Sequence, residues 1–189
     1  MKRKRRELTV EEHDRILAND PEYQARMAKL ERQWAEQNRI LEEDEKPLVA
    51  ALTAAGWPDG VEQVEETRSV WDLVNTSVSY PHLVETLTDH ITRPYHPRTK
   101  EGIARALAVK EAKGTRTPRV LMDELKKETC PDEGPNSYRW TLVNTLVFIG
   151  DSSLLDDVRE LLGDPRYKTI QLDLRRLAQA LTRRGRRKR

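Results

Sequence analysis

Two stretches of this chain of 189 residues decide its fold, because each describes two helices and the second stretch repeats the first. Residues 97–128 read PRTKEGIARALAVKEAKG, then TR, then TPRVLMDELKKE. Residues 137–165 read SYRWTLVNTLVFIG followed by DSSLLDDVRELLGDP. Ile103 in the first helix recurs 39 positions later as Leu142, and both stretches close with a leucine-containing helix that has an aspartate near its middle. Such self-similarity is the signature of a repeat architecture.

Glycine and proline mark the limits of the other predicted helices, since proline fits the first helical turn and glycine ends a helix in a left-handed conformation. Each helix after residue 66 has an apolar stripe at helical spacing, and no strand pattern competes, so the chain is predicted to be all-α. Helices are expected at about residues 9–18, 21–45, 47–55, 66–77, 81–93, 98–113, 118–128, 136–149, 152–162 and 166–184.

A period of roughly 35 to 40 residues with two helices per unit is similar to the HEAT-repeat family, of the armadillo type. The segment LLGDPRYKTIQLDLRRLAQAL, residues 161–181, resembles the end of one such unit and the opening of the next. Two departures are Gln171, where many repeats have arginine, and a degenerate first unit. The resemblance implies a short right-handed α-solenoid of antiparallel helix pairs, and the alternative is a compact irregular bundle.

Four segments are expected from this pattern. They are a basic amino-terminal tail (residues 1–8), a helical cap with a long amphipathic helix (9–60), the HEAT-like repeats (61–184) and a basic carboxy-terminal tail (185–189). The long helix has heptad spacing, which favours a cap over the first repeat or a coiled coil with a partner or a second copy. The heptad positions are Tyr23, Met27, Leu30, Trp34, Gln37 and Leu41.

The net charge of +2 hides an uneven distribution. Residues 1–6 contain five basic side chains and residues 183–189 contain six, which leaves 23 basic against 32 acidic residues, a formal charge of −9, between them. An acidic body argues against a nucleic-acid groove, but the tails could hold phosphates. The candidates are Lys2, Arg3, Lys4, Arg5, Arg6, Arg183, Arg184, Arg186, Arg187, Lys188 and Arg189.

Cysteine content and hydropathy predict a soluble cytoplasmic protein. Cys130 is the single cysteine, so no disulfide framework is available, and the basic start lacks the apolar core of a secretory signal. No run approaches the roughly 18 apolar residues that cross a bilayer.

No pattern of catalytic, metal-ligating or cofactor-binding residues stands out, and we expect neither an enzyme nor a cofactor. His82 and His90 are too far apart along one helix to share a metal, and no histidine is near Cys130 in the sequence. Some DNA glycosylases are HEAT-like and use tryptophans and an aspartate in a basic groove. Trp71 and Trp140 would suit that function, but the acidic body argues against it.

The second helices of successive repeats should share one polar face, which could bind another protein. We therefore expect an adaptor or inhibitor whose partner has a basic patch, with nucleic-acid binding through the tails as the alternative. The expected protein-binding residues are His82, Glu85, Asp89, Arg119, Asp123, Lys126, Trp140, Asp156, Asp157 and Arg159.

Overall fold

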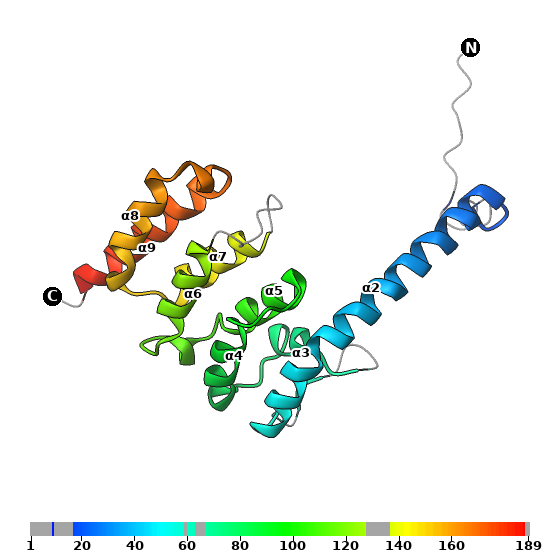
Figure 1. Ribbon diagram of the computed structural model, residues 1–189, viewed down its shortest axis with the longest axis horizontal. Coiled ribbons are helices and arrows are strands. Elements are labelled where there is room, and N and C mark those ends of the chain that lie inside the picture. The colour runs from blue at the N-terminus through cyan, green and yellow to red at the C-terminus, as the bar shows by residue number, and fades with distance from the viewer. Residues whose placement is uncertain (1–8, 10–16, 59, 63–66, 128–136, 188–189) are drawn as a thin grey trace, which may run out of the picture. The chain divides into compact units, whose positions relative to one another are not determined.

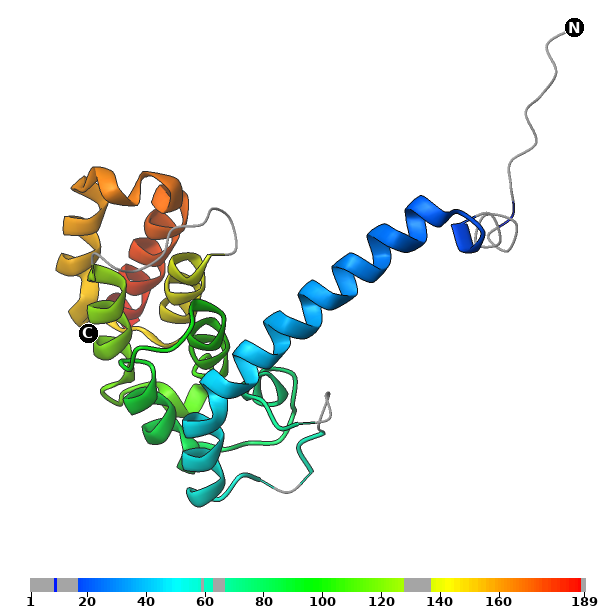
Figure 2. The same cartoon turned by 45° about the vertical axis from the view of Figure 1, so that its right-hand side comes forward.

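The computed structural model describes residues 9, 17–58, 60–62, 67–127 and 137–187, and within these ranges every regular element is a helix. Figures 1 and 2 show the chain in two views. The chain divides into two compact units, Met1–Ile40 and Leu41–Arg189. The basic segment 1–8, most of the helix expected at residues 9–18, and Cys130 lie outside the described residues.

The first long helix, α2 (Pro21–Ala54), begins where the sequence predicts, because the carboxylate of Asp20 accepts hydrogen bonds from the Glu22 and Tyr23 amides. The prediction that the helix breaks at Pro47 is wrong. Pro47 and Glu43, one turn earlier, are both exposed, so water can reach the carbonyl that the proline cannot bond. The buried side chains of Leu48 and Leu52 then hold the last turns in place.

The second unit continues from α2 with seven α-helices among its described residues, several of them preceded by a turn of 3₁₀ helix (η). α5 is shorter than expected because the chain leaves the α-helical path after Ala106 and makes the separate turn η2. The elements are α3 (Val70–Val74), η1 (Pro81–Leu83), α4 (Val84–His90), α5 (Pro97–Ala106), η2 (Lys110–Ala112), α6 (Thr117–Lys126), α7 (Tyr138–Ile149), η3 (Ser152–Leu154), α8 (Leu155–Gly163), η4 (Pro165–Ile170) and α9 (Gln171–Arg187).

The odd-numbered helices α3, α5, α7 and α9 form the first-helix set, in which each member contacts the next. Early in α5, Arg98 lies 3.9 Å over the Trp71 ring of α3, and at its end the Ala106 carbonyl accepts from the Tyr80 hydroxyl, which also contacts the Leu73 carbonyl. α3 and α5 therefore run in the same direction.

The same direction continues through α7 and α9. The Ala104 carbonyl of α5 accepts a 2.9 Å hydrogen bond from Thr145, midway along α7. Arg139 at the start of α7 donates to the Arg166 carbonyl in η4, while Gly150, after the end of α7, accepts from Arg184 near the end of α9. Each first helix is thus displaced sideways from the one before it.

Helices α4, α6 and α8 form the second-helix set. α4 contacts α6 as well as α5, while α6 packs on α7 and α8 packs on α9. The Thr88 and Thr117 hydroxyls, 2.7 Å apart, join α4 to the start of α6. Thr117 is the first residue of α6, one position before the predicted start.

The apolar stripes predicted from the sequence form the core of the second unit. Their leucines and isoleucines are almost all buried, and only Val74, Val120, Leu155 and Leu162 among the stripe residues are partly exposed. Glycine was expected to end helices in a left-handed conformation, and Gly56 and Gly114 do so. Gly150 instead has a negative φ of −62°. A side chain there would meet the Leu146 carbonyl oxygen and Leu181 of α9, so close packing explains this glycine.

Candidate protein-binding surface

The polar residues predicted on the second helices lie on one surface and are joined by ion pairs from helix to helix. Between α4 and α6, Arg116 bridges two carboxylates of α4: its Nε donates to Glu85 over 2.7 Å, and its Nη2 pairs with Asp89. These two hydrogen bonds raise the pKa of Arg116.

The next pair of second helices, α6 and α8, is joined through Asp157. Its carboxylate accepts from Arg119 over 2.6 Å and from Lys126 over 2.8 Å, and Lys126 also pairs with Glu160 over 2.6 Å. Hydrogen bonds from Arg119 and then Lys126 lower the pKa of Asp157, and the bond to Asp157 raises the pKa of Lys126. Asp157 is therefore ionised at neutral pH, at the centre of a network that joins α6 and α8.

Two further pairs lie within single helices, Arg119 with Asp123 in α6 and Arg159 with Asp156 in α8. We name the whole set the second-helix face. Its six carboxylates and four cationic groups leave a net charge of −2. The set comprises Glu85, Asp89, Arg116, Arg119, Asp123, Lys126, Asp156, Asp157, Arg159 and Glu160.

Sequence reasoning missed two members of this face. The predicted helix boundaries place Arg116 in the loop before α6. In the structure Arg116 is the N-cap residue of α6, and its side chain reaches α4. Glu160 is three residues after Asp157, so the helical spacing of acidic residues on α8 could have identified it.

His82 and Trp140, both predicted to bind a partner, are not part of the second-helix face. The His82 ring contacts the Gly56 carbonyl over 2.6 Å, so one ring nitrogen is already engaged. Trp140 lies on α7, in the first-helix set, where it is partly buried and Arg105 is 6.0 Å from the centre of its ring. The sequence predicts Trp140 as an anchor for a partner if it is exposed, and its partial burial on α7 leaves only part of the side chain accessible.

Trp140 instead belongs to an aromatic and cationic cluster on the first helices. Arg98 and Arg105 both lie over the Trp71 ring, and both pair with the buried carboxylate of Glu101. Because one carboxylate is shared by two guanidinium groups, the cluster stabilises the packing of α3, α5 and α7 and keeps one positive charge.

The carboxy-terminal arginines up to residue 187 belong to a helix and not to a tail, because α9 extends to Arg187. Arg184, expected to bind phosphate, is committed to the protein's own backbone. It donates to the carbonyls of Val147 and Gly150 over 2.6 Å and of Phe148 over 3.0 Å. It therefore satisfies carbonyls that the end of α7 leaves without helical partners. Lys2, Arg3, Lys4, Arg5, Arg6, Lys188 and Arg189 lie outside the described residues.

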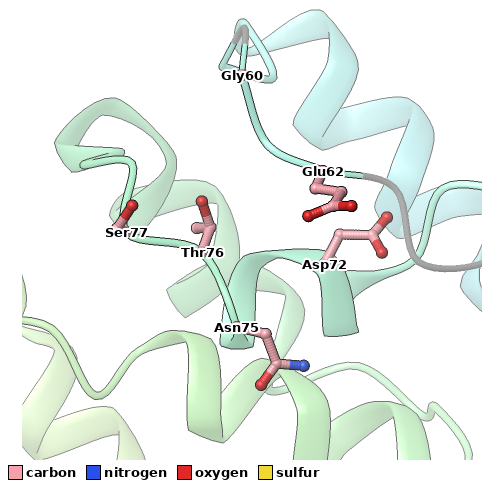
Figure 3. Close-up of a pocket in the computed structure, with 6 residues that line it drawn as sticks. All are labelled: Gly60, Glu62, Asp72, Asn75, Thr76 and Ser77. Atoms are coloured by element: carbon pink, nitrogen blue, oxygen red, sulfur yellow. The ribbon is translucent and has the colours of Figure 1, made fainter.

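A small polar cavity of about 180 Å³ lies beside α3 (Figure 3). Glu62 and Asp72, which lie beside each other in Figure 3, line it together with Asn75. Asp72 also accepts from the Ser69 amide as part of a capping box. The cavity is smaller than the roughly 300–1,000 Å³ typical of ligand pockets, and we assign it no ligand.

No family model, curated protein or solved structure matches the chain. Among the described residues, no three His, Cys, Asp or Glu side chains lie close enough together to hold a metal ion. Nor is any described helix both long and apolar enough to span a bilayer.

Proposed function

We propose that this chain is a non-enzymatic protein-binding module, an adaptor or inhibitor, and that its second-helix face engages a partner with a basic patch. One observation carries the proposal: Arg116 at the N-cap of α6, and Arg119 and Lys126 within it, join carboxylates of α4 and α8. Three helices that are separate in sequence therefore present a single ordered polar surface.

Ion pairing favours recognition because it fixes where the charges lie before a partner arrives. Arg119 and Asp157 hold each other in place, whereas Asp156 and Glu160 remain largely exposed at the edges. A partner would meet a net charge of −2 on this face, within a body of formal charge −9. Complementary charge speeds encounter and rejects wrong partners more than it adds affinity.

The proposal includes the architecture, a short right-handed HEAT-like α-solenoid with residues 61–184 as its repeats. Support comes from the sideways displacement of α3, α5, α7 and α9 in one direction and from the separate chain of contacts through α4, α6 and α8. Solenoids of this kind bind partners along an extended surface. A cytoplasmic location is part of the same proposal, since one cysteine offers no internal disulfide.

The test reverses two exposed charges of the face that are not part of its central network. In the variant Asp123→Lys with Asp156→Lys, the ion pairs of Asp157 remain, so we expect the fold to persist. A matched control reverses Glu22 and Glu31 on α2, which are equally exposed. Wild type, variant and control are each used to purify partners from the native host at moderate salt, followed by quantitative mass spectrometry.

We expect one set of partners to be lost in the variant and retained in the control. Association of a recovered partner, followed by surface plasmon resonance, should slow about tenfold or more between low and high salt. Partners that bind the variant as well as wild type, or an association rate unchanged by salt, would show that the face is not the binding surface.

A further inference from the structure

Helix α9 presents a face that no other described element covers. Leu174, Leu177 and Leu181 are buried, while seven residues on the opposite side are exposed. At 3.6 residues per turn, those seven fall within about one third of the helix circumference. They are Leu172, Arg175, Arg176, Gln179, Thr182, Arg183 and Arg186, and we name them the arginine face.

The four arginines of this face carry charge that no carboxylate among the described residues neutralises. None of Arg175, Arg176, Arg183 and Arg186 makes a salt bridge with another described residue, and the face itself contains no acidic side chain. In contrast, each of the four cations on the second-helix face is paired with a carboxylate. The arginine face therefore stands out as a cationic surface on an otherwise acidic body.

The position of these charges is fixed by the fold. The three bonds from Arg184 to the end of α7 hold the last turns of α9, on the side of the helix that faces the core. From Arg175 to Arg186 the helix rises about 17 Å. The backbone positions of the four arginines are thus held along one side of the helix, so a ligand meets all four on a single surface.

We propose that the arginine face binds the phosphodiester backbone of a nucleic acid without regard to base sequence. Several cationic groups along one side of a helix suit a phosphate backbone, and the arginine fork matches phosphate geometry. Leu172, at one end of the row, is the only large apolar side chain of the arginine face, so the contacts that this face offers are almost wholly electrostatic.

The absence of sequence selectivity follows from the side chains available. Gln179 is the only amide on the face, and no aromatic ring lies there to stack on a base. Binding that rests on about three or four phosphate contacts has a dissociation constant on the order of 10⁻⁴–10⁻⁶ M at physiological salt. For a duplex, a plot of the logarithm of the dissociation constant against the logarithm of salt concentration should have a slope of about 3 in magnitude.

The experiment follows binding of the full chain to a fluorescent 20-base-pair duplex and to an oligothymidylate of 20 nucleotides, by anisotropy between 50 and 200 mM salt. The variant replaces Arg175, Arg176, Arg183 and Arg186 by glutamine. A control replaces Arg3, Lys4, Arg5 and Arg6 by glutamine, which removes the same number of positive charges outside α9. Circular dichroism and thermal melting check that both variants keep the wild-type fold.

We expect the α9 variant to lose at least tenfold in affinity for both oligonucleotides, and the control to lose less. The slope of the logarithm of affinity against the logarithm of salt concentration should fall in the α9 variant by the amount that about three to four phosphate contacts contribute. An α9 variant that binds like wild type, or an equal loss in both variants, would overturn the assignment to α9. Polyglutamate of matched charge that competes as well as the oligonucleotide would overturn the assignment to phosphate and point to an acidic protein.

Discussion

Gly102 in α5 is the residue at which two first helices approach most closely. A β-carbon at this position would lie 2.5 Å from Val70 Cγ1 and 3.1 Å from the Trp71 indole nitrogen, both on α3. Such contacts are shorter than van der Waals packing allows, so only glycine permits this spacing of α3 and α5.

Replacing Gly102 with alanine should lower the free energy of unfolding by about 1–3 kcal/mol through overpacking, partly offset by up to about 1 kcal/mol from the better helix propensity of alanine. Urea denaturation measures the change. Gly163→Ala is the matched control, because a β-carbon there meets nothing within 4 Å, and it should leave stability unchanged or raised. An equal effect at both glycines would contradict the packing argument.

His90 gives the fold a dependence on mildly acidic pH. Burial lowers its pKa, as does the charge of Arg93, while Asp89 acts in the opposite direction. The ring stacks on Tyr95, and its Nδ1 lies 2.7 Å from the Tyr95 hydroxyl. Because the folded pKa lies below the unfolded value of 6.5, the unfolded chain takes up the proton first.

We therefore expect the free energy of unfolding to fall as pH decreases from 7 through 6.5 toward the folded pKa of His90, above the range in which most carboxylates titrate. Urea denaturation at pH 7, 6 and 5 measures this decline. His90→Gln keeps a hydrogen-bonding group for Tyr95 but does not titrate, so its decline should be smaller. Parallel declines in the two proteins would assign the effect to other groups.

The sequence patterns correctly predicted which apolar side chains are buried, but they did not predict which charged side chains form ion pairs. Leu142, Leu146 and Leu177 could be assigned to the core because helical spacing places apolar residues on one side regardless of the neighbouring helix. The partners of Arg116 could not be predicted, because they depend on how far α4 is displaced along α6. For Trp140, the spacing of apolar residues left open whether the ring would be exposed or part of the core, because that depends on which helices pack around it.

At the scale of helices, local signals located most starts, including those of α2 and α7. α3 was predicted too early, at residue 66, although Ser69 and Asp72 form the capping box that sets its start. That spacing of serine and acid was available in the sequence. Where α9 ends was not evident, because Arg184 stabilises it through carbonyls of a different helix.

The bonds from Arg184 join the ends of α7 and α9, so their removal should destabilise the fold. In Arg184→Ala, three carbonyls lose a charged donor, and we expect the free energy of unfolding to fall by about 1–3 kcal/mol. Chemical denaturation of Arg183→Ala provides the comparison, since that neighbour is exposed and should change stability by less than about 0.5 kcal/mol. Comparable losses at both positions would argue against a specific role for Arg184.

At the scale of the whole chain, the amino-terminal unit leaves its heptad positions accessible. Every residue from 31 to 40 is exposed, and Trp34 exposes 55% of its surface. We propose that this segment of α2 pairs with a second copy through the heptad stripe, because a large apolar side chain in such a stripe gains from burial.

Light scattering should therefore show a mass that rises toward a dimer with concentration. Trp34→Lys should shift that rise to concentrations at least tenfold higher, whereas Arg32→Lys, an exposed change outside the stripe, should not. A monomer at every concentration in the wild-type chain would rule out self-association through this helix.

Tyr80 sets an upper limit to the alkaline conditions that the molecule can tolerate. Its phenol lies between the Leu73 and Ala106 carbonyls, at the ends of α3 and α5, and burial followed by the charge of Glu111 raises its pKa from 10.0 to about 12. The stabilisation it contributes is complete below pH 10 and is lost as the pH rises through about 12. A phenolate there would face two carbonyl oxygens without a proton to donate, so strong base should separate the helices at this junction.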